Sequence, residues 1–260
     1  MCGIAGYQKA STNSRLLDRL CTALDRIGHR GPDDAGLTLV DRAGEAKDYA
    51  VPGTDPAATG LSQLDSENPN GHAIALGHRR FSIIDTSPAG HQPFWSDDRT
   101  ICVAFNGEIY NYVELRETIE QQGHQFRIHS DTEVMIHAYL AWGTACFERF
   151  VGFWALTLYE RRVRKLLPAR DRIGKAPLYV CRTPTALMWC SEIEGLLEMA
   201  PQGSERIDEQ SVFEFANWQR RDIDDRTFYR NIKTFPRASV AWVDSDGCYE
   251  PKRYWSLPRR

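Results

Sequence analysis

The sequence predicts an α+β fold in which helices cover stacked β-sheets. Segments with the composition of strands outnumber helical segments, and they follow one another directly, as in residues 72–85 and 99–107. They do not alternate with helices as the strands of a parallel α/β protein do. The chain has 260 residues, 42% of them hydrophobic, and is therefore long enough to bury a substantial core.

The first third of the chain combines a strand, a helix and a long polar stretch. Residues 2–8, "CGIAGYQ", have the small and apolar composition of a buried strand. Residues 14–28 predict a helix, because Leu16, Leu20 and Leu24 recur at helical spacing and Gly28 can end it. The segment from Asp41 to Asn70 is rich in Gly, Pro, Asp, Thr and Ser without a clear period, and predicts a long surface loop.

The remainder adds two further amphipathic helices within a series of strands. Residues 111–123 predict a helix, and residues 130–143 predict another, with Ser130 and Glu133 at the spacing of a capping box and Gly143 at its end. Further strands are expected at 124–129, 153–160, 165–171, 177–181 and 186–191, followed by a helix over 208–218 and a final hairpin.

Composition and charge argue against several classes of protein. A net charge of −3 gives no reason to expect a general affinity for nucleic acid or for an anionic membrane. No run of about 18 apolar residues and no signal-peptide pattern occurs, which favours a cytoplasmic protein without a membrane-spanning helix. The seven cysteines are scattered without a C-x-x-C pair, so neither a disulfide framework nor a metal site is expected.

Cys2 is the first candidate for chemistry. If Met1 is removed, Cys2 carries both a thiol, with a reference pKa of about 8.5, and a free α-amine, with a pKa of about 7.7–8.0. The amine can then serve as general base for the thiol, and no partner histidine is needed. The alternative is a cysteine that only packs beneath the first strand, and from this residue alone the alternative is favoured.

Asn106 and Gly107 could supply the donors that an amide-cleaving thiolate requires. A side-chain amide and the N–H of a glycine, which lets a substrate approach closely, are typical of oxyanion holes. The alternative is that "NG" forms a hairpin turn. A helix rather than a second strand follows it, which weakens that alternative.

Three charged residues could bind the two ends of a free amino acid. Arg80 lies among apolar strand residues, where a guanidinium needs a partner such as a carboxylate. The alternative is a surface arginine on a strand edge, and this alternative applies equally to Arg79. Asp131 follows the Ser130 cap, and Glu108 follows Gly107, so either carboxylate could bind an ammonium group. On composition alone, an ordinary acid of a first helical turn is the better interpretation of Asp131.

Several motifs in order resemble those of one enzyme family. They are "MCGIAGY", "HRGPDDAG", "GHRRFSIIDTSPAGHQPF", "AFNGEIYNYVELR", "SDTEVMIHAY", "ARDRIGKAPLYV" and "SEIEGLL". Together they resemble class II glutamine amidotransferases, and most closely the glutaminase half of glutamine-hydrolysing asparagine synthetases. The resemblance runs from Cys2 to about Leu197, and "RYWSLP" near the end resembles that family's bridge into its second half.

The resemblance implies a four-layer αββα sandwich, the N-terminal-nucleophile hydrolase fold, over residues 2–200, with a C-terminal extension over residues 201–260. It also implies hydrolysis of the glutamine side-chain amide through a thioester, and it assigns residue roles. The implied roles are nucleophile for Cys2, oxyanion hole for Asn106 and Gly107, α-carboxylate binding for Arg80, ammonium binding for Glu108 and Asp131, and pocket lining by the main chain of Ile83 and Ile84.

Three departures from the family pattern keep alternatives open. The lysine of "GKAPLYV" is displaced by one position, the loop from Asp41 to Asn70 is long, and no synthetase half or ATP-binding loop is present. We therefore expect no cofactor in this chain, and ammonia that passes to a synthetase or ligase partner in trans or to a missing second domain. The alternatives are an N-terminal-nucleophile enzyme acting on another amide, peptide or ester, and a catalytically silent scaffold that retains Met1.

Overall fold

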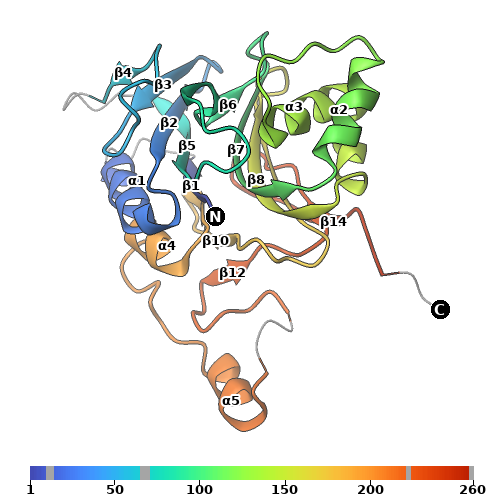
Figure 1. Cartoon of the computed structure of the whole chain (residues 1–260). Coiled ribbons are helices and arrows are strands. Elements are labelled where there is room, and N and C mark those ends of the chain that lie inside the picture. Colours follow the sequence, from blue (N-terminus) through green and yellow to red (C-terminus); the bar gives the residue numbers. More distant parts are fainter. Residues whose placement is uncertain (10–14, 65–70, 221–223, 258–260) are drawn as a thin grey trace.

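The computed structural model describes residues 1–9, 15–64, 71–220 and 224–257 and confirms the predicted α+β sandwich (Figure 1). One sheet has eight strands in the order β12-β10-β11-β1-β5-β2-β3-β4, and the other has six in the order β14-β13-β9-β8-β7-β6. All neighbouring strands are antiparallel except β3 and β4. The sheets are therefore built from hairpins and meanders, as the succession of strand-like segments predicts.

The eight-stranded sheet carries the N-terminus in its interior. Its strands are β1 (Gly3–Lys9), β2 (Asp34–Asp41), β3 (Ala46–Ala50), β4 (Ser62–Gln63), β5 (His72–Arg80), β10 (Tyr179–Arg182), β11 (Ala186–Cys190) and β12 (Ile232–Thr234). Strand β1 pairs with β5 on one side and with β11 on the other. The backbone that follows Cys2 is consequently fixed on both sides by hydrogen bonds.

The six-stranded sheet contains a long antiparallel strand pair, β7 and β8, whose strands are joined through α2 (Tyr112–Glu120) and α3 (Asp131–Trp142). Its strands are β6 (Phe94–Trp95), β7 (Ile101–Ile109), β8 (Gly152–Glu160), β9 (Lys165–Arg170), β13 (Ser239–Val240) and β14 (Lys252–Arg253). Strands β7 and β8 pair over their full lengths, from Ile101 opposite Glu160 to Ile109 opposite Gly152.

Three apolar clusters correspond to the three interfaces of a four-layer sandwich. Helices α1 (Arg15–Arg26) and α4 (Ile193–Met199) pack on the outer face of the eight-stranded sheet. Helices α2 (Tyr112–Glu120) and α3 (Asp131–Trp142) pack on the outer face of the other sheet. The third cluster lies between the sheets and includes Ile4, Ala104 and Trp189. Alternation along each strand sends successive side chains to opposite interfaces.

Three sequence predictions, one of a loop and two of strands, are wrong in whole or in part. Part of the predicted loop between Asp41 and Asn70 forms β3, which pairs with β2, and β4; residues 65–70 lie outside the described residues. The five residues of β3, Ala-Lys-Asp-Tyr-Ala, do not alternate between apolar and polar side chains, so their pattern did not indicate a strand. The segment 124–129 is not a strand, and residues 81–85 do not continue β5.

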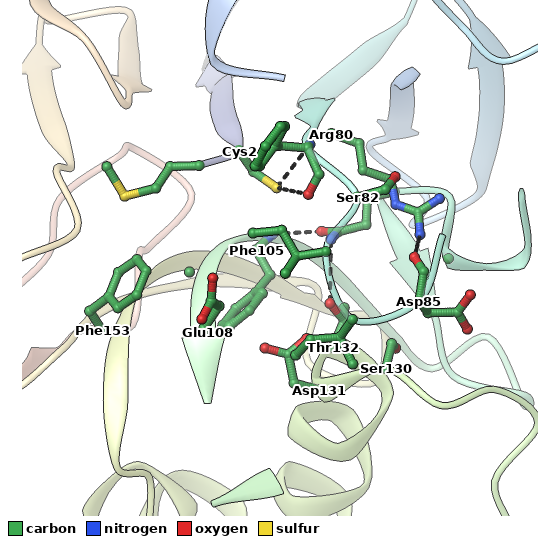
Figure 2. Close-up of a pocket in the computed structure, with 17 residues that line it drawn as sticks. Cys2, Arg80, Ser82, Asp85, Phe105, Glu108, Ser130, Asp131, Thr132 and Phe153 are labelled. Carbon is green, nitrogen blue, oxygen red and sulfur yellow. Dashed lines mark hydrogen bonds between the residues drawn. The ribbon is translucent and has the colours of Figure 1, made fainter. Parts of the chain in front are cut away.

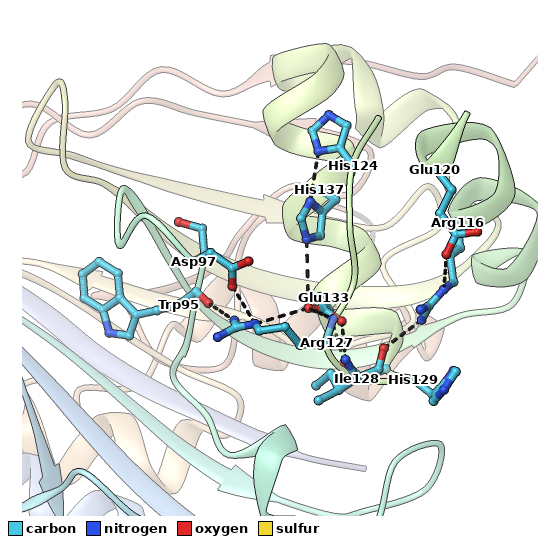
Figure 3. A network of polar contacts seen from close by, with 12 residues as sticks. Trp95, Asp97, Arg116, Glu120, His124, Arg127, Ile128, His129, Glu133 and His137 are labelled. Atoms are coloured by element: carbon cyan, nitrogen blue, oxygen red, sulfur yellow. Dashed lines mark hydrogen bonds and ion pairs between the residues drawn. The ribbon is translucent and has the colours of Figure 1, made fainter. Parts of the chain in front are cut away.

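A carboxylate explains why the segment 124–129 is not a strand. Glu133 in α3 accepts hydrogen bonds from the backbone N–H groups of Arg127 and Ile128, at 2.9 Å each (Figure 3). These donors are therefore occupied by a side chain rather than by a neighbouring strand. The Ser130 hydroxyl accepts from the N–H of Glu133 at 3.1 Å, which confirms the predicted N-cap, and Gly143 ends the helix as expected.

The segment beyond Ala200 extends both sheets and adds one projecting helix. Strand β12 pairs with β10, and β13 pairs with β9, whereas α5 (Glu209–Trp218) lies away from the sandwich (Figure 1). The predicted boundary at residue 200 stays a prediction. None of the helices in the described ranges has the length and apolar character that would let it cross a membrane.

Asp171 lies at the end of β9 and organises the turn that follows. Its carboxylate is buried and accepts five backbone hydrogen bonds at 2.7–3.2 Å, from Trp154, Ile173, Gly174, Lys175 and Ala176. The turn between β9 and β10 is thus held to β8 by a single side chain.

We expect Asp171→Ala to lower the free energy of unfolding by about 3 kcal/mol or more, because several N–H groups lose a buried acceptor worth roughly 1–3 kcal/mol each. Urea denaturation followed by tryptophan fluorescence measures the change. Asp246→Ala, at an exposed aspartate of the last hairpin, is the matched control. Equal unfolding free energies for the two variants would contradict this role of Asp171.

Candidate active site

A cavity lies where the start of β1, the end of β5, the end of β7 and the start of α3 meet (Figure 2). Seven of the eight predicted site residues line it: Cys2, Arg80, Ile83, Ile84, Gly107, Glu108 and Asp131. Asn106 is completely buried and does not line it. The fold thus brings together residues that are separated by up to 129 positions, from Cys2 to Asp131.

The Cys2 thiol is held by the main chain of Phe81. The Phe81 N–H donates to Sγ at 3.4 Å, and the thiol donates to the Phe81 carbonyl at 3.6 Å (Figure 2). Burial raises the pKa of the Cys2 thiol, while the Phe81 N–H and the N-terminal ammonium group oppose that effect. The sulfur is thereby held at the cavity wall.

The main chain of Cys2 is held by a residue to which the sequence analysis assigned no role. Arg30 donates from Nε to the Cys2 carbonyl at 2.9 Å and forms an ion pair with Glu192 at 2.9 Å. The signal was present, since Arg30 belongs to the "HRGPDDAG" motif. Met1 also lines the cavity, with 48% of its surface exposed, so the α-nitrogen of Cys2 becomes an amine only when Met1 is removed.

Asn106 and Gly107 lie inside β7, so the hairpin-turn interpretation of "NG" is wrong. A Cβ on Gly107 would lie 2.2 Å from the Phe153 carbonyl oxygen, which only glycine avoids at this φ of +156°. Asn106 Nδ2 lies 3.5 Å from Ser191 Oγ, and Asn106 Oδ1 is buried without a hydrogen-bond partner. Asn106 therefore sits behind the cavity wall that Gly107 forms.

Strand alternation separates Arg80 from Arg79. Arg79 turns toward α1 and donates to the carbonyl of Leu24 at 2.8 Å, whereas Arg80 faces the cavity. The Arg80 guanidinium donates to the Asp85 carbonyl (Figure 2) and, at 2.8 Å, to the Ser87 carbonyl. Arg80 is thus both the cation of the cavity and the anchor of the segment after β5.

Two carboxylates provide the negative end of the cavity. Asp131, in the first turn of α3, accepts from the Ile109 N–H at 3.0 Å. Burial raises the pKa of Asp131 to about 6, and the nearby Glu108 carboxylate adds to this effect. Glu108, near the end of β7, also lines the cavity (Figure 2).

The remaining wall belongs to the segment after β5. Ile83 is half-exposed, with 51% of its surface accessible, and Ile84 is less exposed. The displaced lysine of "GKAPLYV", Lys175, does not line the cavity but lies over the Phe153 ring, with Nζ 4.7 Å from the centroid. Within the described residues, no cluster of three or more His, Cys, Asp or Glu side chains could hold a metal ion.

The two-sheet sandwich with a cysteine at the start of an internal strand is the architecture of N-terminal-nucleophile hydrolases. A family model described as a glutamine amidotransferase domain matches residues 65–255. The chain belongs to this glutamine amidotransferase family, and its N-terminal cysteine places it in class II.

Named relatives and a solved structure agree with this assignment. Asparagine synthetase [glutamine-hydrolyzing] 3 of Bacillus subtilis is 26% identical over 99% of this chain and 37% of its own length. Asparagine synthetase [glutamine-hydrolyzing] of Sandersonia aurantiaca is 33% identical over 75% of this chain and 31% of its own length. The chain therefore spans about a third of these relatives. Glutamine phosphoribosylpyrophosphate amidotransferase of B. subtilis has a similar fold, with a TM-score of 0.71 and 19% identity over 98% of this chain and 50% of that one.

Because the pKa of Asp131 is raised in the folded chain, we expect the free energy of unfolding to depend on pH. Between the reference pKa of 3.8 and the folded value of about 6, the native chain binds a proton that the unfolded chain has released. We therefore expect the free energy of unfolding to fall as the pH rises through this window, by on the order of 2 kcal/mol relative to Asp131→Asn. Denaturation of both proteins at several pH values measures it, and parallel curves would contradict the shift.

Proposed function

We propose that this chain hydrolyses the side-chain amide of L-glutamine to glutamate and ammonia through a thioester on Cys2. The observation that carries the proposal is the set of groups around one cavity: a held thiol, a guanidinium, and a buried carboxylate. A thiol alone would suit many amides. The opposite charges of Arg80 and Asp131 match the carboxylate and ammonium groups of a free α-amino acid.

The reaction begins when removal of Met1 frees the α-amine of Cys2. The amine takes the thiol proton, and the thiolate attacks the side-chain carbonyl carbon of glutamine. The carbonyl oxygen becomes an oxyanion that accepts from the Asn106 side chain and the Gly107 N–H. The C–N bond then breaks, the protonated amine gives its proton to the leaving nitrogen, and ammonia departs.

A water molecule completes the cycle. The amine, again neutral, takes a proton from the water, which attacks the thioester carbon and forms a second tetrahedral intermediate. Breakage of the C–S bond returns the thiol and releases glutamate. One residue thus acts as nucleophile, base and acid.

The relatives support a proposal for the destination of the ammonia. Those of B. subtilis and S. aurantiaca are asparagine synthetases that hydrolyse glutamine, and this chain corresponds to about a third of them. We propose that ammonia passes to a synthetase partner or second domain, that this chain needs no cofactor of its own, and that it acts in the cytoplasm. Exposed Phe81, Ile83 and Tyr110 near the cavity leave an apolar rim that such a partner could cover.

The proposal is tested by glutamate release from L-glutamine, measured for protein whose first residue is Cys2. We expect turnover with glutamine, none with Cys2→Ala, and far weaker turnover with asparagine, N-acetylglutamine and simple esters. A higher kcat/KM for a substrate without a free ammonium or carboxylate group would favour the alternative of a repurposed amidohydrolase. Absence of turnover with every substrate would favour the silent scaffold.

Asn106→Ala removes one donor to the oxyanion. We expect kcat to fall by about 10²–10³-fold with KM for glutamine nearly unchanged, because the donor acts mainly in the transition state. Steady-state kinetics measure both constants. Near-normal turnover would contradict the role assigned to Asn106.

Arg80→Ala is expected to act on binding instead. Loss of a charge-assisted hydrogen bond worth roughly 1.5–3 kcal/mol should raise the dissociation constant of glutamine by about 10- to 100-fold. Because Arg80 also anchors the segment after β5, Ser87→Ala is the control, since it keeps the backbone carbonyl that Arg80 contacts. Calorimetric titration of Cys2→Ala protein with glutamine measures affinity without turnover, and unchanged affinity would contradict the assignment.

A further inference from the structure

Ser191 connects the strand of the nucleophile to the oxyanion-hole residue of the other sheet. It directly follows β11 and is completely buried. Its N–H donates to the Ile4 carbonyl at 2.8 Å, and its Oγ accepts from the Ile4 N–H at 2.9 Å. Ile4 is two residues from Cys2, so the Ser191 side chain continues the pairing of β1 almost to the nucleophile.

The contact between Ser191 and Asn106 leaves two groups without partners. Nδ2 of Asn106 lies 3.5 Å from Ser191 Oγ, a long contact, and Oδ1 is buried without any partner. Ser191 Oγ would then accept from two N–H groups. Within the part of the chain that the structure describes, its own proton has no acceptor. A buried polar group without a partner costs about 1–3 kcal/mol.

A half-turn of the Asn106 carboxamide gives partners to Oδ1 and to the Ser191 hydroxyl proton, and leaves Nδ2 as the one group without a partner. The amide oxygen and nitrogen are nearly equal in size, so the rotation exchanges their places without a steric cost. The Ser191 hydroxyl then accepts from Ile4 and donates to Oδ1. Nδ2 moves to the position that Oδ1 occupies before the rotation, where it makes no hydrogen bond to Ser191. A preorganised donor that awaits an anion is what an oxyanion hole requires.

We infer that Ser191 is a positioning residue that fixes the Asn106 carboxamide with its NH₂ group directed to the oxyanion and ties it to the strand of Cys2. The inference rests on the proposed function. It gives a role to the serine of "SEIEGLL", which carries no charge and lies outside the cavity wall. Among the described residues, the Ser191 hydroxyl makes the only hydrogen bond to the Asn106 carboxamide. Without that hydroxyl, no contact favours one orientation of the carboxamide over the flipped one.

The test is a double-mutant cycle with Ser191→Ala and Asn106→Ala, in protein whose first residue is Cys2. We expect Ser191→Ala to lower kcat for glutamine by about 10- to 100-fold, with KM within about twofold, since misplacement of a catalytic group can cost that much. In the Asn106→Ala background the same substitution should change kcat by less than about twofold, because Ser191 acts through Asn106. Ser239→Ala, at another buried serine that bonds a backbone carbonyl, is the control.

A second readout separates positioning from a general effect on β1. Alkylation of Cys2 by iodoacetamide needs the thiolate but no oxyanion hole, so its rate should be the same in Ser191→Ala and wild-type protein. Slower alkylation, an equal loss in both backgrounds of the cycle, or unchanged kcat in Ser191→Ala would each overturn the inference while leaving the proposed function intact. Wild-type protein without glutaminase activity would instead overturn both.

Discussion

The pairing of β1 with β5 and β11 is the constraint on which the site depends. A nucleophile at a chain terminus would ordinarily move with the fraying end. Here the backbone is paired with β5 from Gly3 onward and with β11 from Ala5 onward. The Cys2 carbonyl is bound by Arg30, and the thiol is held by Phe81. The terminus is thereby rigid enough to carry catalytic geometry, and its nitrogen stays close to the sulfur by covalent connection alone.

The second sheet supplies the groups that the terminus lacks. Strand β7 ends at the cavity with Gly107 and Glu108, and α3 begins there with Asp131. Gly107 approaches the Phe153 carbonyl too closely for any side chain, and the Asp131 carboxylate is held by the backbone N–H of Ile109. Charge is thus placed at low accessibility, where electrostatic attraction to a substrate is strong.

Sequence reasoning predicted the elements whose signals are local. Spacing and capping residues predicted the helices and most of the strands. The motifs predicted seven residues of the cavity wall. Predictions were wrong where the structure of a segment depends on contacts with residues far away in sequence. Segment 124–129 alternates like a strand, but the Glu133 carboxylate accepts hydrogen bonds from two of its N–H groups. Strand β3, whose residues show no alternation, forms because it pairs with the edge of β2. Arg30 was indicated by its place in "HRGPDDAG", whereas the contact between Ser191 and Asn106 could not be predicted because it joins residues far apart in sequence.

The central claim is that the α-amine of Cys2 is the base for its own thiol. It is tested most directly by preparing one chain in two forms, through protease cleavage of a fusion that leaves either Cys2 or Met1 as the first residue. Intact mass verifies each form, and glutamate release from L-glutamine is then compared. We expect turnover only for the form that begins with Cys2. Equal turnover for the form that retains Met1 would contradict it.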